Sequence, residues 1–446
     1  MTEGTGQPAT PLPGPKGYPL VGVLPAVLRR GFIPVMEQAW RDHGDVFELP
    51  IGRARVVVVA HPDGVERVLR ANRDNYFKGP VYDNLRVLLG DGLATREGPG
   101  WKTRRRQLQP AFHARRVRAQ VPAMRAEAER VLAELRAQVP AGGVVDVSAA
   151  MTRLTFGIVG HSLFGLDLVA ETGATTGAIA AALEELAERG STRPSFPLWV
   201  PTPGNLRLRR LVRELDARIA AVVAAGRSAG DRGDLLSALV GLRDAGELTD
   251  RELRDEILTM FLAGYETVAL ALAWSWYLLA DAPEVQARLA AEAEGGLDVE
   301  RLPYTRQVVD ESLRLRPVAW IVARDVRADD VLLGRRIPAG ATVLCSQLLV
   351  HRHPKFWRDP DRLDPDRWAP GAAGPGHDFA YFPFSKGPRV CIGSEFGLAE
   401  CQVVLATMAR ALTVHRLPDE VVGTRPLNNL RPDRPIRLAI RWRPAP

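Results

Sequence analysis

The chain of 446 residues has only three cysteines, Cys345, Cys391 and Cys401, and their spacing shows no paired pattern. This scarcity excludes a disulfide framework and favours a reducing compartment, so we expect a cytoplasmic location. Lysine is also scarce, with five residues, and the net charge of +7 therefore comes almost entirely from arginine. No run of basic residues alternates with aromatic residues, and we predict that the protein does not bind nucleic acid.

The first residues lack the basic region followed by an apolar region that is typical of a signal peptide. They are rich in Thr, Gly and Pro instead. Residues 1–20 are predicted to form a flexible, Pro-rich tail, and no membrane anchor is expected. Because no repeat or linker divides the rest, residues 21–446 are predicted to form one large domain.

The pattern of apolar residues predicts a mainly helical fold with small β-sheets. In chain order, the expected elements are a β-hairpin over 46–60, a helix from Pro62, helices over 101–237 with breaks at 140–143 and 192–204, further helices up to Pro317, short strands over 331–350 and a last helix over 394–412.

One helix is predicted to begin with a capping box formed by Thr249 and Glu252 and to run to about Ala280. Its residues 257–280 are apolar on nearly every side, which is compatible with a transmembrane span or with a helix through the centre of a large protein. A carboxylate at Glu266, in the middle of the run, would be costly in lipid. The buried central helix is therefore the favoured interpretation.

The strongest chemical signal is the segment from Phe384 to Gly393, with Gly387, Arg389 and Cys391 between them. It places one cysteine in a glycine-containing loop just before a helix, where backbone N–H groups favour a thiolate. The glycines allow a bulky flat ligand to approach the backbone, and Arg389 offers a cation for an anionic group. A thiolate with such neighbours suits haem iron. The alternative for an isolated cysteine is a buried structural role.

Three further groups of residues carry weaker signals. Ala263, Gly264, Glu266 and Thr267 lie in mid-helix, where the Thr267 hydroxyl can compete for the Ala263 carbonyl and open the helix for water or dioxygen. The acid and the hydroxyl are the parts of a proton relay, although a simple helix kink is the alternative. The other two groups are a helical Glu–Arg pair, and a Trp with an arginine that can bind carboxylates; they comprise Glu311 and Arg314, and Trp101 and Arg105.

Together these motifs resemble those of the cytochrome P450 family, in its soluble bacterial form. The resemblance implies a triangular, mainly helical domain with haem b between the central helix and the helix after the cysteine loop. It implies that Cys391 is the axial thiolate, that Phe384 and Gly393 flank the haem, and that Ala263, Gly264, Glu266 and Thr267 serve dioxygen activation. Trp101, Arg105, Arg324 and Arg389 would bind the haem propionates, and Glu311, Arg314 and Arg367 would hold the coil that carries the cysteine loop.

The same resemblance places substrate contacts in regions that are almost wholly apolar in this chain. The predicted contacts are Val81, Tyr82, Leu85, Phe196, Trp199, Leu262, Val318, Ala319 and Trp320. An apolar lining favours a small lipophilic substrate, either a terpenoid or a polyketide-like metabolite or, as an alternative, a fatty acid.

The chain contains no nucleotide-binding fingerprint of a reductase, so electrons from NAD(P)H are expected to arrive through a ferredoxin or flavodoxin and its reductase. A basic face made of Arg104, Arg106, Arg115, Arg116, Arg118 and Lys386 is predicted to attract such an acidic partner. The function expected is O2-dependent monooxygenation. The alternatives are a haem-thiolate peroxygenase or isomerase, a haem sensor or carrier without turnover, and a membrane-anchored form.

Overall fold

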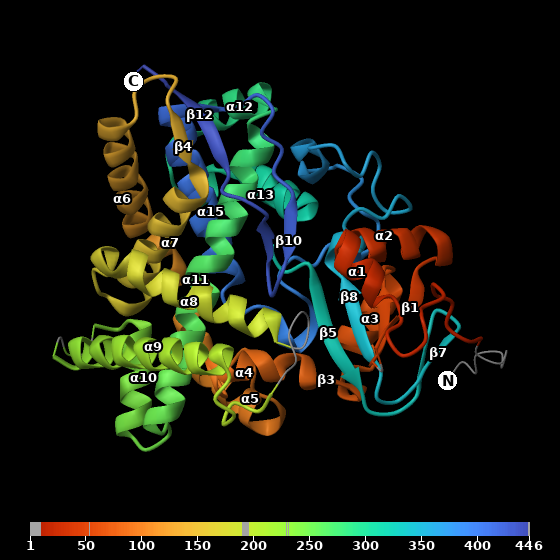
Figure 1. Cartoon of the computed structure of the whole chain (residues 1–446). Helices are drawn as coiled ribbons and strands as arrows, with labels where there is room; N and C mark the ends of the chain where they lie inside the picture. Colours follow the sequence, from red (N-terminus) through yellow and green to blue (C-terminus); the bar gives the residue numbers. More distant parts are fainter. Residues whose placement is uncertain (1–9, 53, 190–195, 229, 231, 445–446) are drawn as a thin grey trace. The chain divides into compact units, whose positions relative to one another are not determined.

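The computed structural model describes residues 10–52, 54–189, 196–228, 230 and 232–444. The chain divides into two compact units. Unit 1 comprises residues 1–81, 314–362 and 373–391, and unit 2 comprises residues 82–313, 363–372 and 392–446. Figure 1 shows helices as the main elements beside small sheets, so the predicted fold class is confirmed.

Unit 1 is organised around a five-stranded sheet in the order β1-β2-β8-β5-β3. Strands β1 (Val46–Ile51) and β2 (Ala54–Val59) form the predicted antiparallel hairpin, and β2 pairs in parallel with β8 (Thr342–Ser346). Strand β5 (Ile321–Val326) joins β8 to β3 (Tyr76–Phe77), and β6 (Asp330–Leu332) pairs with β7 (Arg335–Ile337). Buried Val, Leu and Ile side chains of these strands form the core of the unit.

The helices of unit 1 are short. They are α1 (Leu24–Arg30), α2 (Phe32–His43), α3 (Pro62–Glu66) and α14 (Gln347–Val350). Pro62 occupies the first turn of α3 as predicted, because its missing N–H is not needed there. The prediction of strand over the last residues of 331–350 was wrong at α14, where the Ser346 hydroxyl accepts the N–H of Leu349 and begins a helical turn.

The prediction of a flexible tail over residues 1–20 needs correction for its described part. Thr10 donates its N–H to Gly334, and Pro13 accepts the N–H of Glu48 in β1. Tyr18 and Gly22 exchange two backbone hydrogen bonds. Residues 10–22 are therefore anchored to the β-structure of unit 1.

Unit 2 contains the long helices and two small sheets. Its helices are α4 (Asp83–Leu89), α5 (Gly98–Leu108), α6 (Ala114–Gln138), α7 (Val147–Phe164), α8 (Thr172–Glu188), α9 (Pro203–Ser228), α10 (Leu235–Asp244), α11 (Asp250–Leu279), α12 (Pro283–Glu294), α13 (Pro303–Leu315), which ends in unit 1, and α15 (Ser394–Ala411). The sheets are β4-β12-β9 (Val144–Asp146, Arg437–Trp442, Leu412–Arg416) and β10-β11 (Thr424–Pro426, Leu430–Pro432).

Helix α11 passes through the interior of unit 2 and packs on α7 and α15. The Thr249–Glu252 capping box is present, and the helix ends at Leu279, as predicted. By length and composition α11 could cross a membrane, but 78% of its most apolar window is buried inside the protein. The structure thus supports the central-helix interpretation over the transmembrane one.

Two breaks in the predicted helical region differ from expectation. The first break, predicted over 140–143, fills the longer interval between α6 and α7 and includes the short strand β4. A break that was not predicted follows Phe164, where Gly165 caps α7 with a left-handed φ of 59°. Residues 192–195 of the second predicted break lie outside the described residues, and Gly204 already belongs to α9.

Candidate functional site

The three cysteines have different environments. Cys345 and Cys401 are buried, whereas Cys391 is exposed. Burial raises the pKa of the Cys345 thiol to about 12 and also raises the pKa of Cys401 well above its ordinary value. Both buried thiols therefore stay protonated at neutral pH, and Cys391 is the cysteine that can present a thiolate to a ligand.

The loop of Cys391 is shaped by its own backbone. The N–H of Cys391 donates to the carbonyl of Phe384 at 2.9 Å, and a short 3-10 turn covers Gly387–Arg389. Gly387 has a φ of 77°, and a Cβ at this position would lie 2.2 Å from the carbonyl oxygen of Leu69. Only glycine can satisfy both conditions. The side chain of Arg389 is half-buried in this loop.

The middle of α11 has an unusual exposed position. Ala263 is exposed although Leu262 and Glu266 on the same helix are buried. The Thr267 hydroxyl donates to the Ala263 carbonyl at 2.6 Å, as predicted, and a Cβ on Gly264 would lie 2.8 Å from a methyl carbon of Val159. An accessible small residue beside a hydroxyl in a core helix allows a large flat ligand to approach, so these residues fit the haem that the sequence implies.

Glu266 is buried and paired with an arginine that the sequence analysis missed. Arg431 in β11 donates to Glu266 Oε1 through Nε at 2.9 Å and through Nη2 at 2.6 Å. Glu266 Oε2 is buried and has no hydrogen-bond partner among the described residues. Arg431 is 165 positions from Glu266, and no local pattern in the sequence indicates this pair.

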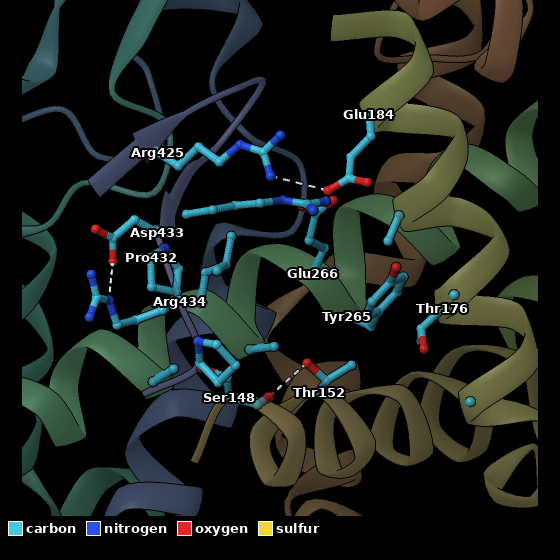
Figure 2. A pocket seen from close by; sticks show the side chains of 18 residues that line it. Ser148, Thr152, Thr176, Glu184, Tyr265, Glu266, Arg425, Pro432, Asp433 and Arg434 are labelled. Carbon is cyan, nitrogen blue, oxygen red and sulfur yellow. Dashed lines mark hydrogen bonds and ion pairs between the residues drawn. The ribbon is translucent and has the colours of Figure 1, made fainter. Parts of the chain in front are cut away.

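Glu266 also lines a cavity of about 510 Å³ within unit 2 (Figure 2). Small residues of α8 and α11, namely Gly173, Gly177, Ala180, Ala269 and Ala273, leave this space open. Two ion pairs border it, Arg425 with Glu184 at 3.2 Å and Arg434 with Asp433 at 3.3 Å. With the charged side chains of Glu184, Arg425 and Arg431 in its walls, the cavity is large and polar enough to hold water.

On α5, Trp101 is buried, and Arg105 is half-buried with its Nε donating to Gln109 Oε1 at 2.8 Å. In unit 1, Arg324 on β5 is buried and donates to the carbonyl of Ala323 at 2.7 Å. The four arginine and tryptophan side chains predicted to bind propionates are thus divided between the units, Trp101 and Arg105 in one and Arg324 and Arg389 in the other.

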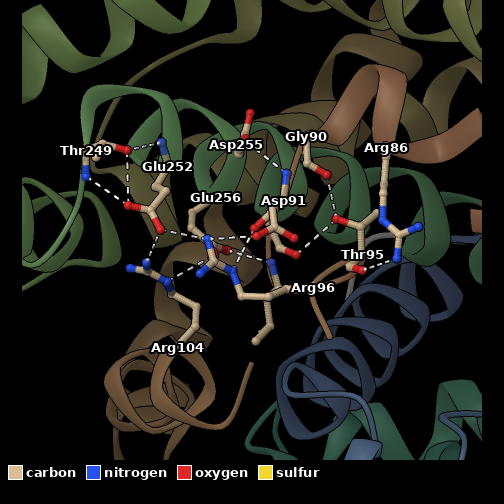
Figure 3. A network of polar contacts seen from close by, with 12 residues as sticks. Arg86, Gly90, Asp91, Thr95, Arg96, Arg104, Thr249, Glu252, Asp255 and Glu256 are labelled. Atoms are coloured by element: carbon tan, nitrogen blue, oxygen red, sulfur yellow. Dashed lines mark hydrogen bonds and ion pairs between the residues drawn. The ribbon is translucent and has the colours of Figure 1, made fainter. Parts of the chain in front are cut away.

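The prediction that Arg104 belongs to a basic surface was wrong. Arg104 is 4% exposed and lies 3.3 Å from both Glu252 and Glu256 of α11 (Figure 3). The other predicted members are exposed or engaged with neighbours. Arg116 donates to the Gly233 carbonyl, Arg118 pairs with Glu300 at 2.7 Å, and Lys386 of unit 1 pairs with Asp378.

Figure 3 shows how acidic residues of α11 hold the segment between α4 and α5. Asp255 Oδ2 accepts the N–H of Asp91 at 2.9 Å, and Glu256 Oε2 accepts the N–H of Leu93 at 3.0 Å. A Cβ on Gly92 would lie 2.3 Å from the Thr259 hydroxyl, so the segment packs closely on the helix.

Glu311 of α13 is completely buried and joins the coil at 363–372, as predicted. Its Oε1 accepts the N–H of Asp364 at 3.0 Å and the Arg367 Nε at 3.2 Å, while Trp368 Nε1 donates to Oε2 at 3.0 Å. Arg314 is also buried and donates to the carbonyls of the downstream coil in unit 1, those of His351, Pro360 and Arg362. The carboxylate and the guanidinium thus each fix a segment of coil.

The predicted substrate residues have unequal exposure. Tyr82, Leu85 and Ala319 are half-buried, and Leu262 and Val318 are buried. Trp320 is buried against the Phe32 ring, with centroids 5.7 Å apart. Val81, Phe196 and Trp199 are exposed, Trp199 to 77%.

Comparison with known proteins gives one consistent result. The cytochrome P450 family model matches residues 12–439. Cyclooctatin synthase of Streptomyces melanosporofaciens is 34% identical over 95% of this chain and 94% of its own length. Pentalenene oxygenase of Streptomyces avermitilis is 32% identical over 92% and 96%, respectively. The crystal structure of a cytochrome P450DA heme domain superposes with a TM-score of 0.86 at 27% identity, covering 98% of both chains.

The Glu256 environment predicts a pH dependence of stability. Burial raises the pKa of Glu256 from 4.5 to about 7, against the opposing effects of the Leu93 N–H and Arg104. The folded protein then holds this proton more tightly than the unfolded chain, so stability falls as pH rises through this window. Relative to Glu256→Gln, the free energy of unfolding of the wild type should fall between pH 4.5 and about 7 and then level off.

Denaturant unfolding at a series of pH values measures this difference. Glu294→Gln, at an exposed position of α12, is the control and should track the wild type. A constant difference between the wild type and Glu256→Gln across the window would contradict the assignment.

Proposed function

The chain belongs to the cytochrome P450 family of haem-dependent monooxygenases, and we propose that it inserts one oxygen atom of O2 into a small lipophilic secondary metabolite, a terpenoid in the first place and a polyketide-like compound in the second. The observation that carries the proposal is that the chain has both an exposed Cys391 and an intact acid–hydroxyl pair at Glu266 and Thr267. The oxygenase and synthase relatives named above are matched over nearly the whole chain, which supports it.

Cys391 would hold the haem iron, with Phe384 and Gly393 beside it in the sequence. Trp101, Arg105, Arg324 and Arg389 would bind the two propionates, because indole and guanidinium N–H groups are suited to carboxylates. When bound, the haem supplies the centre at which dioxygen is activated.

The residues of α11 would supply protons to this chemistry. Glu266 lines the cavity of Figure 2, but its unpaired Oε2 is buried, so a side-chain movement would bring this oxygen to water in the cavity. Arg431 donates two hydrogen bonds to Oε1 and thereby orients the carboxyl group. For delivery, the carboxyl group would take up a proton that enters from solvent through the cavity and donate it to the Thr267 hydroxyl, which passes on its own proton and must leave its bond to the Ala263 carbonyl. Arg431 is therefore a positioning residue.

A lipophilic substrate is supported by the apolar character of the predicted contacts, especially Leu85, Leu262 and Val318. A fatty acid, the alternative substrate, would need a cation for its carboxylate. Arg86 is the nearest cation in the sequence to Leu85, but it pairs with Asp83 and donates to the Thr95 carbonyl at 3.1 Å. This engagement disfavours the fatty acid.

Electrons would come from NAD(P)H through a ferredoxin or flavodoxin and its reductase, in the cytoplasm. Arg106 and Arg115 are exposed and remain candidates for the docking of an acidic partner, whereas the buried Arg104 does not. The proposal of a monooxygenase is preferred to a peroxygenase, an isomerase or a sensor because those functions do not require a proton relay such as Glu266 and Thr267 could provide.

The reaction is tested by incubating the holoenzyme with a panel of cyclic terpene hydrocarbons, a surrogate ferredoxin and reductase, NADPH and ¹⁸O2. The expected product carries one ¹⁸O atom and is detected by mass spectrometry. Fatty acids of matched carbon number are the comparison. Product from peroxide alone, with none from NADPH and the partners, would contradict monooxygenation, and conversion restricted to fatty acids would contradict the substrate class.

The role of Thr267 is tested by Thr267→Ala. Loss of the hydroxyl should lower the product formed per O2 consumed by about tenfold or more, since positioned proton donors contribute at least this much. The matched control is Ser275→Ala, because the Ser275 hydroxyl makes an equivalent bond to the Ala271 carbonyl on the same helix, at 2.7 Å. Unchanged coupling in Thr267→Ala, or an equal loss in the control, would contradict the assigned role.

A further inference from the structure

The segment 16–30 of unit 1 displays several large apolar side chains on the surface. Tyr18 is 68% exposed, Leu20 83%, Val21 39% and Leu28 62%. These four are a third of the twelve exposed large apolar residues among the described part of the chain, although the segment is only fifteen residues long. Together with Lys16, Arg29 and Arg30 we name them the N-terminal patch. A concentration of exposed large apolar side chains in one short segment indicates an interaction site.

The backbone presents one of these side chains at an energetic cost. Leu20 lies at the tip of the turn that Tyr18 and Gly22 close with two backbone hydrogen bonds. Its φ is 68°, a left-handed conformation that glycine or asparagine adopts far more readily than leucine. A solvent-facing leucine at such a position contributes nothing to the core, so the strain is consistent with a role outside the fold.

The charges around the patch have one sign. Residues 4–36 contain no Asp or Glu and three basic residues, Lys16, Arg29 and Arg30. All three are exposed, and none makes a side-chain hydrogen bond or ion pair with another residue of the described ranges. By contrast, Arg55 on the neighbouring hairpin is neutralised by Glu48 at 2.9 Å. The patch therefore combines exposed apolar side chains with unneutralised positive charge.

We propose that the N-terminal patch docks the protein reversibly on an anionic lipid surface. Apolar side chains at the tip of a turn can enter the boundary between headgroups and acyl chains, while flanking Lys and Arg residues bind anionic headgroups. A second copy would need a self-complementary surface, and the patch contains no acid to complement its own bases. Peripheral docking is compatible with a cytoplasmic protein.

If the proposed function holds, docking would bring the enzyme to the phase in which a terpenoid substrate dissolves. The docking itself does not depend on that reaction. Vesicle binding is measured without substrate or electron donors, so its failure leaves the proposed reaction standing. A failure to oxidise terpenes likewise leaves the docking proposal standing.

The test is co-sedimentation of the holoenzyme with vesicles of phosphatidylglycerol and phosphatidylcholine, compared with pure phosphatidylcholine vesicles, at low and high salt. We expect binding to the anionic vesicles only, with loss at high salt. The variant K16Q/R29Q/R30Q should lower the partition coefficient by about a hundredfold, since each basic residue near such a surface contributes about fivefold. The variant L20S/V21S/L28S, which removes three of the exposed apolar side chains, should abolish binding to the anionic vesicles.

Two matched variants serve as controls. R251Q/R358Q/R441Q removes three exposed arginines elsewhere, and V144S/V331S/V421S removes three exposed valines elsewhere. Both should bind as the wild type does, and circular dichroism and thermal unfolding should show that all four variants are folded.

Three outcomes would overturn the proposal. They are no binding to anionic vesicles, equal losses in the patch variants and their controls, and salt-insensitive binding to pure phosphatidylcholine. Light scattering adds a fourth, because a dimer that dissociates in L20S/V21S/L28S would show that a second copy covers the patch.

Discussion

The constraint on which the structure of unit 2 depends is the burial of α11. A helix that is apolar on nearly every side must be enclosed, and each polar group on it then needs a partner from another element. Glu252 and Glu256 meet Arg104 of α5, Asp255 holds the backbone of the segment after α4, and Glu266 meets Arg431 of β11. The polar residues of one helix thus fix the positions of elements that are far apart in the sequence.

The need of buried polar groups for hydrogen-bond partners also explains the hydrogen bonds in the middle of α11. Thr267 satisfies its hydroxyl on the Ala263 carbonyl, and Thr155 of α7 donates to the carbonyl of Tyr265 at 3.0 Å. The helix is continuous here and not opened as the sequence suggested, but in this stretch Ala263 is exposed and Glu266 keeps one oxygen unpaired. The exposed alanine and the unpaired oxygen lie in the stretch where the proposed function needs access to a ligand and a supply of protons.

Several features set by local patterns were predicted correctly, although the turn capped by Ser346 and the break at Gly165 were missed, whereas contacts set by distant partners were mostly not predicted. The capping box at Thr249, the hairpin over 46–60 and the bond from Thr267 to Ala263 depend on neighbouring residues. The predicted contact between Glu311 and Arg367 was also found, because the family resemblance supplied the missing long-range information. Arg431 and the burial of Arg104 depend on contacts more than a hundred residues apart and leave no periodic or spaced signal in the sequence.

The central claim is that Cys391 binds haem iron as a thiolate, and the absorption spectrum of the dithionite-reduced protein with and without carbon monoxide tests it most directly. We expect a Soret band strongly red-shifted by carbon monoxide in the wild type, in Cys345→Ala and in Cys401→Ala, and its loss in Cys391→Ala. The two buried cysteines are the matched controls, because their thiols stay protonated. A Soret band typical of histidine ligation, or a red-shifted band that persists in Cys391→Ala, would contradict the account.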